Sequence, residues 1–319
     1  MSLPLPRLSC ALVGLVTIAY VVSAQDLGPS AASVIDLIDL ETGARTTIPH
    51  GDGSDLQPVW SPKGDRLAFV SDRDGNMEIY LYEPAKDVLR RITENVGRDA
   101  NPAWSPDGRG LVLSSEAAGE RGLYLMGADG SGMKRLTGSE GSDEYSAWKP
   151  DSTLIYFARA RGIFTLDPDE LGGATNLRGG DSRSPMGSPG RRVYGEGELP
   201  AAIRFLRPGG GCRDLAWSLD GSLLAFAAER QGVFDLYVVT PEGERLRRIT
   251  QAKGNAVEPT WHPDGLYLAY TLLTDEGAEI RRVNSDGSRD VPMIHTRPGD
   301  RDPAWSPDGA TLAVVRPAG

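Results

Sequence analysis

Short apolar runs alternate with polar, glycine-containing turns along most of the chain. One such stretch has apolar runs at residues 67–70 and 79–82, with a polar loop at 71–76 between them and a basic run at 90–93 behind them. Apolar runs of this length, bounded by turn residues, are typical of buried β-strands. No window shows a sustained 3.6-residue apolar period, so the pattern predicts strands and argues against a solenoid of helix pairs.

Tryptophan marks an internal repeat of this pattern. The six tryptophans stand at positions 60, 104, 148, 217, 261 and 305, and every interval but one is 44 residues. Each begins a stretch of the form Trp-Ser-Pro-Asp-Gly, although the copies at 148 and 217 have diverged. Pro-Asp-Gly favours a tight turn because Pro presets φ and Gly accepts a positive φ. Four short strands in a repeat of 44 residues predict one blade of a β-propeller.

The two ends of the chain predict how the ring of blades closes. The last repeat has room for two strands only. At the N-terminal end, Ile35 lies where Ile79 lies in the first complete repeat, and Ile48 lies where Ile92 lies. Residues 33–49 should therefore complete the last blade, which removes two free sheet edges. The predicted fold class is all-β: a six-bladed β-propeller whose ring is closed by N-terminal strands that complete the last blade.

One interval breaks the period. Trp148 and Trp217 are separated by 69 residues, which is 25 more than the common interval. Residues 163–166 supply the third strand of that blade, so the excess falls within about residues 171–213, between blades 3 and 4. This insert is rich in Gly, Pro and Arg, a composition typical of a disordered segment as well as of a functional loop. Both interpretations stay open.

The first residues have the layout of a secretory signal. Arg7 precedes an apolar run over residues 8–22, and residues 22–24 fit the positions that a signal peptidase recognises. We therefore expect a signal peptide at 1–24 and a propeller at 25–319, located in the periplasm or secreted. The apolar run is short for a membrane anchor, although an uncleaved anchor is the alternative, and no other segment has membrane-spanning length.

Composition narrows the choice of partners. The formal net charge is −10 at pH 7, and an acidic exported chain is a poor match for nucleic acid. Of the two cysteines, Cys10 lies in the expected signal peptide, so Cys212 is left alone and no intramolecular disulfide is predicted. A closed ring has no strand edge that a second copy would need to cover, and the expected state is a monomer.

The Trp-Ser-Pro-Asp-Gly start, the polar loop at 71–76 and the Arg-Arg-Ile-Thr ending resemble the TolB-like propeller repeat. The resemblance covers about residues 33–316. It implies a six-bladed periplasmic propeller that binds a protein partner of the cell envelope. The small α/β domain that precedes the propeller in TolB has no counterpart here, so we expect a TolB-like role only. The same repeat also occurs fused to prolyl-peptidase domains, but the chain contains no Gly-x-Ser-x-Gly nucleophile motif.

Metal and catalytic motifs are weak. His262 replaces the serine of a turn motif, whereas His50 and His295 lie near strand ends of different blades, and nothing indicates that any two of them converge. Residues 72–83 space oxygen atoms like a calcium loop, but Met77 stands where such a loop needs glycine. Cys212 has no histidine or cysteine near it in the sequence. No catalytic residue, metal ligand or cofactor is therefore predicted.

Polar residues recur near the start of each repeat's first strand, where they should ring the mouth of the central channel. Facing one another, they could grip a basic segment, hold a sugar or a cation, or simply cap turns. The predicted function is a non-enzymatic scaffold that binds a protein or peptide there. The alternative is a lyase or hydrolase that uses carboxylates and a divalent metal to act on a glycan. The predicted binding residues are Asp55, Gln57, Asp99, Asn101, Asp143, Tyr145, Arg213, Asp214, Glu258, Asp300 and Asp302.

Overall fold

Strands of two to eight residues, joined by tight turns, account for the regular structure of the described chain. The computed structural model describes residues 32–138, 142–151, 154–159, 162–168, 191–194, 211–251 and 253–318, with 191–194 described by their backbone alone. These residues belong to one compact unit, residues 31–319. The expected signal peptide at 1–24 lies outside them.

The described strands form six antiparallel sheets of four strands each, and each sheet is one blade. Blades 1 to 3 are built from β3 (Asp55–Trp60), β4 (Leu67–Ser71), β5 (Glu78–Glu83), β6 (Val88–Arg91), β7 (Asp99–Trp104), β8 (Gly110–Ser115), β9 (Gly122–Gly127), β10 (Lys134–Arg135), β11 (Asp143–Trp148), β12 (Ile155–Arg159), β13 (Gly162–Leu166) and β14 (Arg191–Tyr194). Blades 4 to 6 are built from β15 (Cys212–Trp217), β16 (Leu224–Arg230), β17 (Val233–Val239), β18 (Arg247–Arg248), β19 (Asn255–Trp261), β20 (Tyr267–Thr274), β21 (Gly277–Asn284), β22 (Val291–Pro292), β23 (Arg301–Trp305), β24 (Thr311–Pro317), β1 (Ser33–Asp39) and β2 (Arg45–Thr47).

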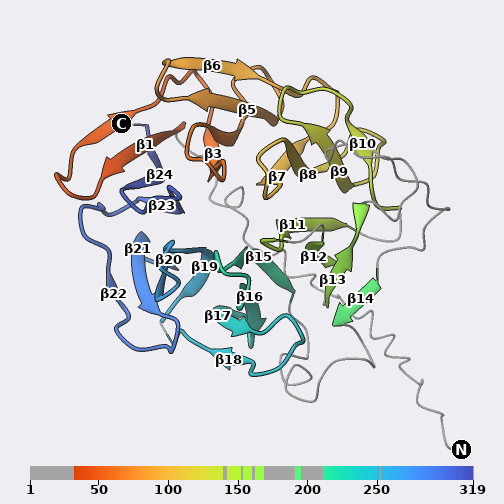
Figure 1. The fold of residues 1–319 in the computed structure, drawn as a ribbon. Helices are drawn as coiled ribbons and strands as arrows, with labels where there is room; N and C mark the ends of the chain where they lie inside the picture. The colour runs from red at the N-terminus through yellow and green to blue at the C-terminus, as the bar shows by residue number, and fades with distance from the viewer. Residues whose placement is uncertain are drawn as a thin grey trace, which may run out of the picture. The chain divides into compact units, whose positions relative to one another are not determined.

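The blades are arranged around a common centre, with the first strand of each blade innermost (Figure 1). The prediction of a six-bladed, all-β propeller is therefore confirmed. Neighbouring blades contact each other mainly through these inner strands, as β3 does with β7 and β15 does with β19. Every strand shares its sheet with three others, and the closed ring limits free edges to the short outermost strands.

The last blade combines both ends of the described chain, as predicted from residues 33–49. Its strand order is β2-β1-β24-β23, and β1 pairs with β24 from Ser33 opposite Pro317 to Asp39 opposite Thr311. The predicted equivalence of Ile48 and Ile92 is also confirmed. Ile48 N–H donates to the Ile35 carbonyl at 3.0 Å, and Ile92 N–H donates to the Ile79 carbonyl at 2.9 Å.

A buried carboxylate ties the two ends together in this blade. Asp36 lies on β1, and only 4% of its side chain is exposed. Its Oδ2 atom accepts hydrogen bonds from Arg316 Nε at 2.8 Å and from Arg45 Nη1 at 3.3 Å, and its Oδ1 atom accepts one from the Thr47 hydroxyl at 2.7 Å. One side chain therefore joins β1, β2 and β24.

The Pro-Asp-Gly segments form the turns that the sequence predicts. In blade 2, Gly108 has φ of 71° and donates its N–H to the Ser105 carbonyl at 2.9 Å. The Ser105 hydroxyl donates to Asp107 at 2.7 Å and accepts from Gly110 N–H at 2.9 Å. Serine, aspartate and glycine therefore fix the hairpin between the first and second strands.

Each tryptophan packs where one blade meets the next. Trp104 shares a hydrophobic cluster with Phe69 and Tyr80 of blade 1, and its Nε1–H donates to the Val59 carbonyl of that blade at 3.1 Å. Trp261 Nε1–H donates in the same way to a carbonyl of blade 4, at 3.1 Å. The repeated tryptophan thus provides apolar surface and, in these two blades, a polar link to the preceding blade.

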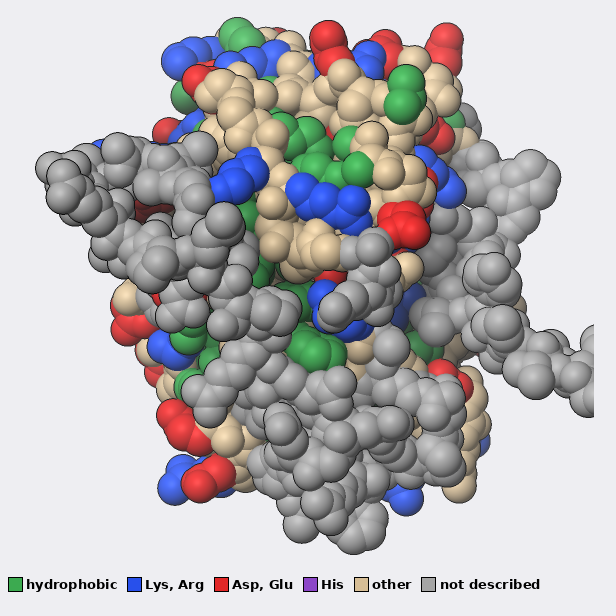
Figure 2. All heavy atoms as spheres, turned by 90° about the vertical axis from the view of Figure 1, so that its right-hand side faces the viewer, with side chains coloured by type: hydrophobic (Ala, Val, Ile, Leu, Met, Phe, Trp, Pro, Cys, Tyr) green, Lys and Arg blue, Asp and Glu red, His purple; other side chains and the backbone are tan. Residues whose placement is uncertain are grey.

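The long interval between the third and fourth tryptophans contains a strand. β14 pairs with β13, so the fourth strand of blade 3 comes from within the segment predicted as an insert at 171–213. Residues 169–190 and 195–210 lie outside the described residues, and the role of the insert stays a prediction. On the described part of the face nearest blade 3, acidic and basic side chains are interspersed (Figure 2).

No helix that is long and apolar enough to cross a membrane occurs among the described residues.

Candidate functional site

Six residues with an unusual backbone conformation stand at equivalent positions in the inner strands. Each lies three residues before a repeat tryptophan and has φ between 52° and 56°. Positive φ is uncommon for residues other than glycine, and it is least expected for large side chains. We call these six residues the channel ring: Gln57, Asn101, Tyr145, Asp214, Glu258 and Asp302.

A β-bulge accounts for this conformation. In every inner strand the pairing register shifts across the ring residue, for example between Leu56 and Val59 in β3. A bulge leaves one residue unpaired, bends the strand and turns the side chain in a new direction. Each ring side chain keeps a partly exposed surface although much of it is enclosed by protein, as expected on the wall of a channel. Such bulges are frequent next to functional sites.

Hydrogen bonds run from one ring residue to the next around part of the channel. The unpaired N–H of each linked residue donates to the side chain of the ring residue in the preceding blade. Glu258 N–H donates to Asp214 Oδ2 at 3.1 Å, and Asp302 N–H donates to Glu258 Oε2 at 3.0 Å. Gln57 N–H donates to Asp302 Oδ2 at 2.5 Å, and Asn101 N–H donates to Gln57 Oε1 at 2.7 Å. These four bonds, the ring relay, link five blades.

Tyr145 is the ring residue that takes no part in these four bonds. The Arg213 guanidinium instead lies over the Tyr145 ring, with its central carbon 5.1 Å from the ring centroid. Arg213 Nε also donates to Asp214 Oδ2 at 2.8 Å. A cation–π contact therefore spans the junction between blades 3 and 4.

The ring is chemically two-sided. Asp214, Glu258 and Asp302 supply three carboxylates from consecutive blades, whereas Gln57 and Asn101 supply amides that hold each other, with Gln57 Nε2 donating to Asn101 Oδ1 at 3.0 Å. Burial, together with the charge of Glu258, raises the pKa of Asp302 well above its usual range. Burial and the charge of Asp214 likewise raise the pKa of Glu258. The charge of the buried Arg301 lowers both pKa values in part, and that of Arg213 lowers the pKa of Glu258, but burial and mutual repulsion outweigh them. A further cation beside Glu258 and Asp302 would therefore favour their charged forms.

In Arg213 the surroundings favour the charged form of the side chain. Burial alone would lower the pKa of this guanidinium, but Asp214, Tyr145 and Glu258 together outweigh burial and raise it. Arg213 therefore stays charged beside Asp214, and one of the three carboxylates of the ring is already paired.

Four other predicted residues lie away from the channel surface. Asp55, Asp99, Asp143 and Asp300 are at most 1% exposed. Asp55 accepts from Arg73 Nη2 at 2.7 Å, Asp143 from Arg159 Nη2 at 2.8 Å, and Asp300 pairs with Arg45. Such ion pairs fix the backbone at the start of an inner strand. The turn-capping interpretation of these side chains therefore fits the structure better than the partner-binding interpretation.

The histidines lie apart from the channel ring. His262 is in the turn after β19, stacks on Tyr267 with ring centroids 4.5 Å apart, and meets Trp305 edge-on at 4.6 Å. His50 and His295 are exposed, His50 in the connection between β2 and β3 and His295 in the connection between β22 and β23. Among the described residues, no group of three or more His, Cys, Asp or Glu side chains is placed to hold a metal ion.

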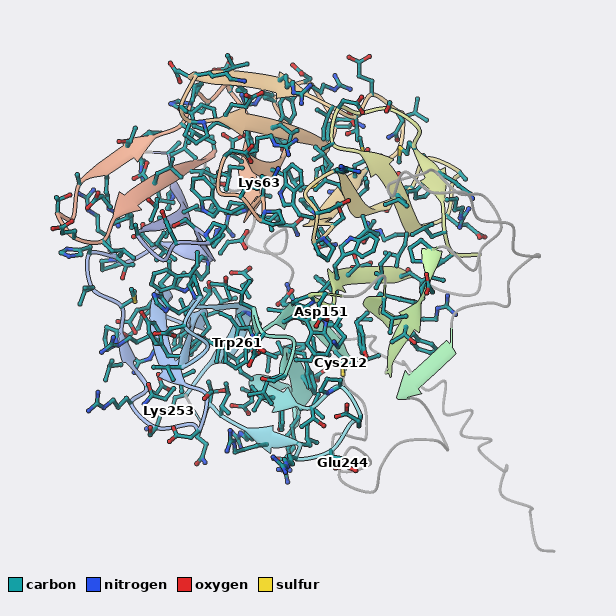
Figure 3. The ribbon with its side chains drawn as sticks, in the orientation of Figure 1. Lys63, Asp151, Cys212, Glu244, Lys253 and Trp261 are labelled. Carbon is teal, nitrogen blue, oxygen red and sulfur yellow. The ribbon has the colours of Figure 1, made fainter. Side chains whose placement is uncertain are left out.

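Two further labelled positions lie in the turns that follow inner strands. Lys63 and Asp151 occupy the turns after the first strands of blades 1 and 3, and both lie toward the centre of the ring (Figure 3). Cys212, at the start of β15, is half-buried. The sequence did not predict the bulges, the ring relay or the arginines that pair with the buried aspartates.

Comparisons with known proteins agree with this fold. The family model described as the TolB beta propeller domain matches residues 16–191 and 209–319. Among curated proteins, the chain is 33% identical over 66 residues to an uncharacterized peptidase, YuxL, of Bacillus subtilis. That match covers 20% of this chain and 10% of the relative, so the chain spans a small part of that relative's length.

Three solved structures have similar folds. A protein assigned as a TolB from Agrobacterium tumefaciens superposes with a TM-score of 0.69 and 19% identity, over 91% of this chain and 99% of that one. TolB from Acinetobacter baumannii gives 0.64 and 18%, over 86% and 66% of the two chains. An oligogalacturonate lyase from Vibrio parahaemolyticus gives 0.52 and 15%, over 89% and 78%. At these identities the likeness is one of fold.

Proposed function

The chain belongs to the TolB beta propeller domain family, and on this premise we propose that it is a non-enzymatic scaffold that binds a protein or peptide partner at the channel ring. The observation that carries the proposal is the run of three carboxylates, from Asp214, Glu258 and Asp302, on left-handed residues of consecutive blades. Residues held in such conformations cluster at binding and active sites.

A basic segment fits this half of the ring. Half-buried carboxylates attract an ammonium or guanidinium group more strongly than exposed carboxylates do. The raised pKa values of Glu258 and Asp302 support the same partner chemistry, since a cation would supply the charge compensation that protons otherwise supply. The amide half, with Gln57 and Asn101, would then accept and donate hydrogen bonds to the backbone of the segment.

We propose further that residues 1–24 are a signal peptide and that residues 25–319 act as a monomer in the periplasm or outside the cell. The partner would then be a protein of the cell envelope. The layout of residues 1–24, the TolB-like repeat and the net charge of −10 support this placement.

The test removes charge from the ring while keeping its hydrogen bonds. Asp214→Asn, Glu258→Gln and Asp302→Asn keep an acceptor oxygen at each position. Gln57 already shows that an amide can serve in the relay, because its Oε1 accepts from Asn101 N–H at 2.7 Å. The matched control removes three carboxylates from the hairpin turns after the first strands, with Asp107→Asn, Asp264→Asn and Asp308→Asn.

Two measurements use these proteins. Pull-downs from an envelope extract compare capture by the wild type, the ring variant and the control. Isothermal titration with an arginine-rich peptide, and with the same peptide carrying citrulline, tests whether positive charge is required. We expect the ring variant to lose affinity by about tenfold or more, and the control to lose little. Equal capture by the ring variant and the wild type would remove the channel ring from the binding function.

The alternative function, a carboxylate- and metal-dependent lyase or hydrolase, predicts a different result. A divalent metal that binds only the folded protein must raise its melting temperature. A rise with Mn²⁺ or Ca²⁺ that the ring variant abolishes would favour the enzyme over the scaffold.

A further inference from the structure

A buried pair of aspartate and arginine recurs at the entry of the inner strands. In blade 1, Arg73 lies in the loop after β4 and its Nη2 donates to Asp55 at 2.7 Å. In blade 3, Arg159 reaches Asp143 at 2.8 Å in the same manner. Both arginines also lie over aromatic rings of their own blades, as Arg73 does over Tyr80 with its central carbon 4.8 Å from the centroid. Each buried carboxylate thus has a fixed positive charge beside it.

Blade 2 has the aspartate without the arginine. Asp99 is the counterpart of Asp55, five residues before the tryptophan, but Ala117 stands thirteen residues after that tryptophan, where blade 1 has Arg73. The Asp99 side chain is fully buried. Its Oδ2 accepts from Asn95 Nδ2 at 2.7 Å, whereas its Oδ1 has no hydrogen-bond partner among the described residues.

A second buried polar atom has lost its partner in the same blade. In blade 1 the Tyr80 hydroxyl donates to Asp74, the residue that follows Arg73. Blade 2 has Tyr124 at the position of Tyr80 and Ala118 at the position of Asp74. The Tyr124 hydroxyl has no partner in the described part of the chain. Asp55 also keeps one oxygen, Oδ2, without a partner among the described residues, so what Ala117 removes from Asp99 is the guanidinium charge. Ala118 removes the hydrogen-bond partner of the Tyr124 hydroxyl.

The charged groups near Asp99 do not take the place of the arginine that blade 1 has at position 73. Glu78 of blade 1 is also fully buried, and it pairs with Arg91 Nη2 at 2.9 Å. Asn95 holds both acids, since its N–H donates to Glu78 Oε1 at 3.2 Å. On the side of blade 2, Glu116 and Arg121 pair with each other at 2.5 Å, and Arg98 is exposed with its Nη2 3.7 Å from Met77 Sδ. Of the two buried carboxyl groups, that of Glu78 pairs with an arginine, and no such pair involves Asp99 among the described residues.

We propose that Asp99 is a buried proton-binding site at the junction of blades 1 and 2. An unpaired carboxylate in the protein interior is so unfavourable that the group takes up a proton instead. Asp99 also joins the two blades directly, because its N–H donates to the Met77 carbonyl of blade 1 at 2.8 Å. The proton takes the place that a guanidinium occupies in blades 1 and 3.

The protonation behaviour follows from the same geometry. Burial first, and the charge of Glu78, raise the pKa of Asp99 to about 6, although the hydroxyls of Ser115 and Thr93 lower it in part. A carboxyl group with a raised pKa contributes stability that is complete below its unfolded pKa and is lost as the pH rises through the folded pKa. The junction should therefore loosen between about pH 4 and pH 7.

The test uses the mature protein and three variants. Asp99→Asn gives the site a permanently neutral group of the same shape. Ala117→Arg places an arginine where blade 1 has Arg73. Ala118→Arg adds the same charge one residue further along the loop, at an exposed position, and serves as the matched control. Carbon-13 NMR of labelled aspartate carboxyl groups follows the titration, and urea unfolding from pH 4 to pH 8 measures the linked stability.

We expect one aspartate resonance of the wild type to titrate near pH 6. It should be missing in Asp99→Asn, shifted to lower pH by Ala117→Arg, and shifted far less by Ala118→Arg. Unfolding of Asp99→Asn should take up about one proton more than unfolding of the wild type near pH 5. The proposal fails if every aspartate of the wild type titrates below pH 5, or if Asp99→Asn leaves the titration unchanged. A melting temperature at pH 8 that rises with Na⁺ or Ca²⁺ only when Asp99 is present would show a metal ion in place of the proton.

Discussion

The side chain of Asp36 gives a sharp test of how the ring is closed. Its carboxylate joins three strands from opposite ends of the described chain, through Arg316, Arg45 and Thr47. Asp36→Ala removes all three bonds at once and leaves two arginines facing an apolar methyl group. The matched control is Glu41→Ala, which removes an exposed carboxylate from the turn directly after β1.

The expected magnitude follows from burial. Removing one partner of a buried ion pair destabilises a protein by about 3–5 kcal/mol, because the other charge is left uncompensated. Arg316 is 29% exposed and can be hydrated in the variant, whereas Arg45 is 9% exposed and keeps Asp300. We therefore expect a loss of about 2–3 kcal/mol in the free energy of unfolding, equivalent to roughly 4–10 °C in melting temperature.

Urea unfolding at pH 7 measures the loss, and its pH dependence identifies the cause. Burial raises the pKa of Asp36, but the hydrogen bonds from Thr47 and Arg316 outweigh burial and the pKa is lowered overall. The contribution of such a group is present above its unfolded pKa and is lost as the pH falls through the folded pKa. The difference between the wild type and Asp36→Asn should therefore shrink below about pH 4.

A loss below about 0.5 kcal/mol for Asp36→Ala would refute the reasoning, since that is the range of ordinary surface substitutions. An equal loss for Glu41→Ala would assign the effect to the general charge of the region. A difference between the wild type and Asp36→Asn that stays constant down to pH 3 would show that packing, and not charge, is responsible.

Two further predictions concern the repeat tryptophans and the carboxylates of the channel ring. Trp104 and Trp305 are both 6% exposed, but only the Nε1–H of Trp104 has a partner among the described residues, the Val59 carbonyl. Trp104→Phe should therefore lower the free energy of unfolding in urea by about 1 kcal/mol more than Trp305→Phe does. Equal losses in the two variants would show that the hydrogen bond to Val59 adds no stability. Glu258 and Asp302 have raised pKa values in the folded protein. Their contribution to folding stability is therefore complete below the pKa values of the unfolded chain, and it is lost as the pH rises through the pKa values of the folded protein. The Glu258→Gln, Asp302→Asn double variant should thus gain on the wild type between pH 4 and pH 8 in thermal unfolding, and a constant difference would contradict the shifts.

The fold could be predicted from the sequence because its determinants are local and repeated. A tryptophan every 44 residues, a turn motif after it and an apolar run on each side define a blade without knowledge of any other blade. Ring closure was predictable because the N-terminal isoleucines Ile35 and Ile48 keep the register of the repeat. The position of β14 was not predictable, since no repeated residue marks it within the long interval between the third and fourth tryptophans.

The candidate site could be predicted only in part, because its geometry depends on backbone conformation and on distant partners. The left-handed bulges leave no sequence signal, since Gln57, Tyr145 and Glu258 are not residues that favour positive φ. Asp300 pairs with Arg45, 255 positions away in the sequence. An aspartate stands five residues before four of the six tryptophans, and in blade 1 Arg73 follows it. That pattern would have indicated that Asp55 belongs to a buried ion pair.

Strand β1 cannot pair with β24 until residues 311–317 have been synthesised. Its seven residues include Val34, Ile35 and Ile38, all at most 2% exposed in the folded protein, and β24 ends at Pro317. During synthesis, an apolar edge strand is therefore exposed while the five other blades form. This exposed interval is where we expect misassembly and chaperone dependence to concentrate, and variants that weaken the pairing of β1 with β24 should lower the yield of folded protein more than their effect on the folded state implies.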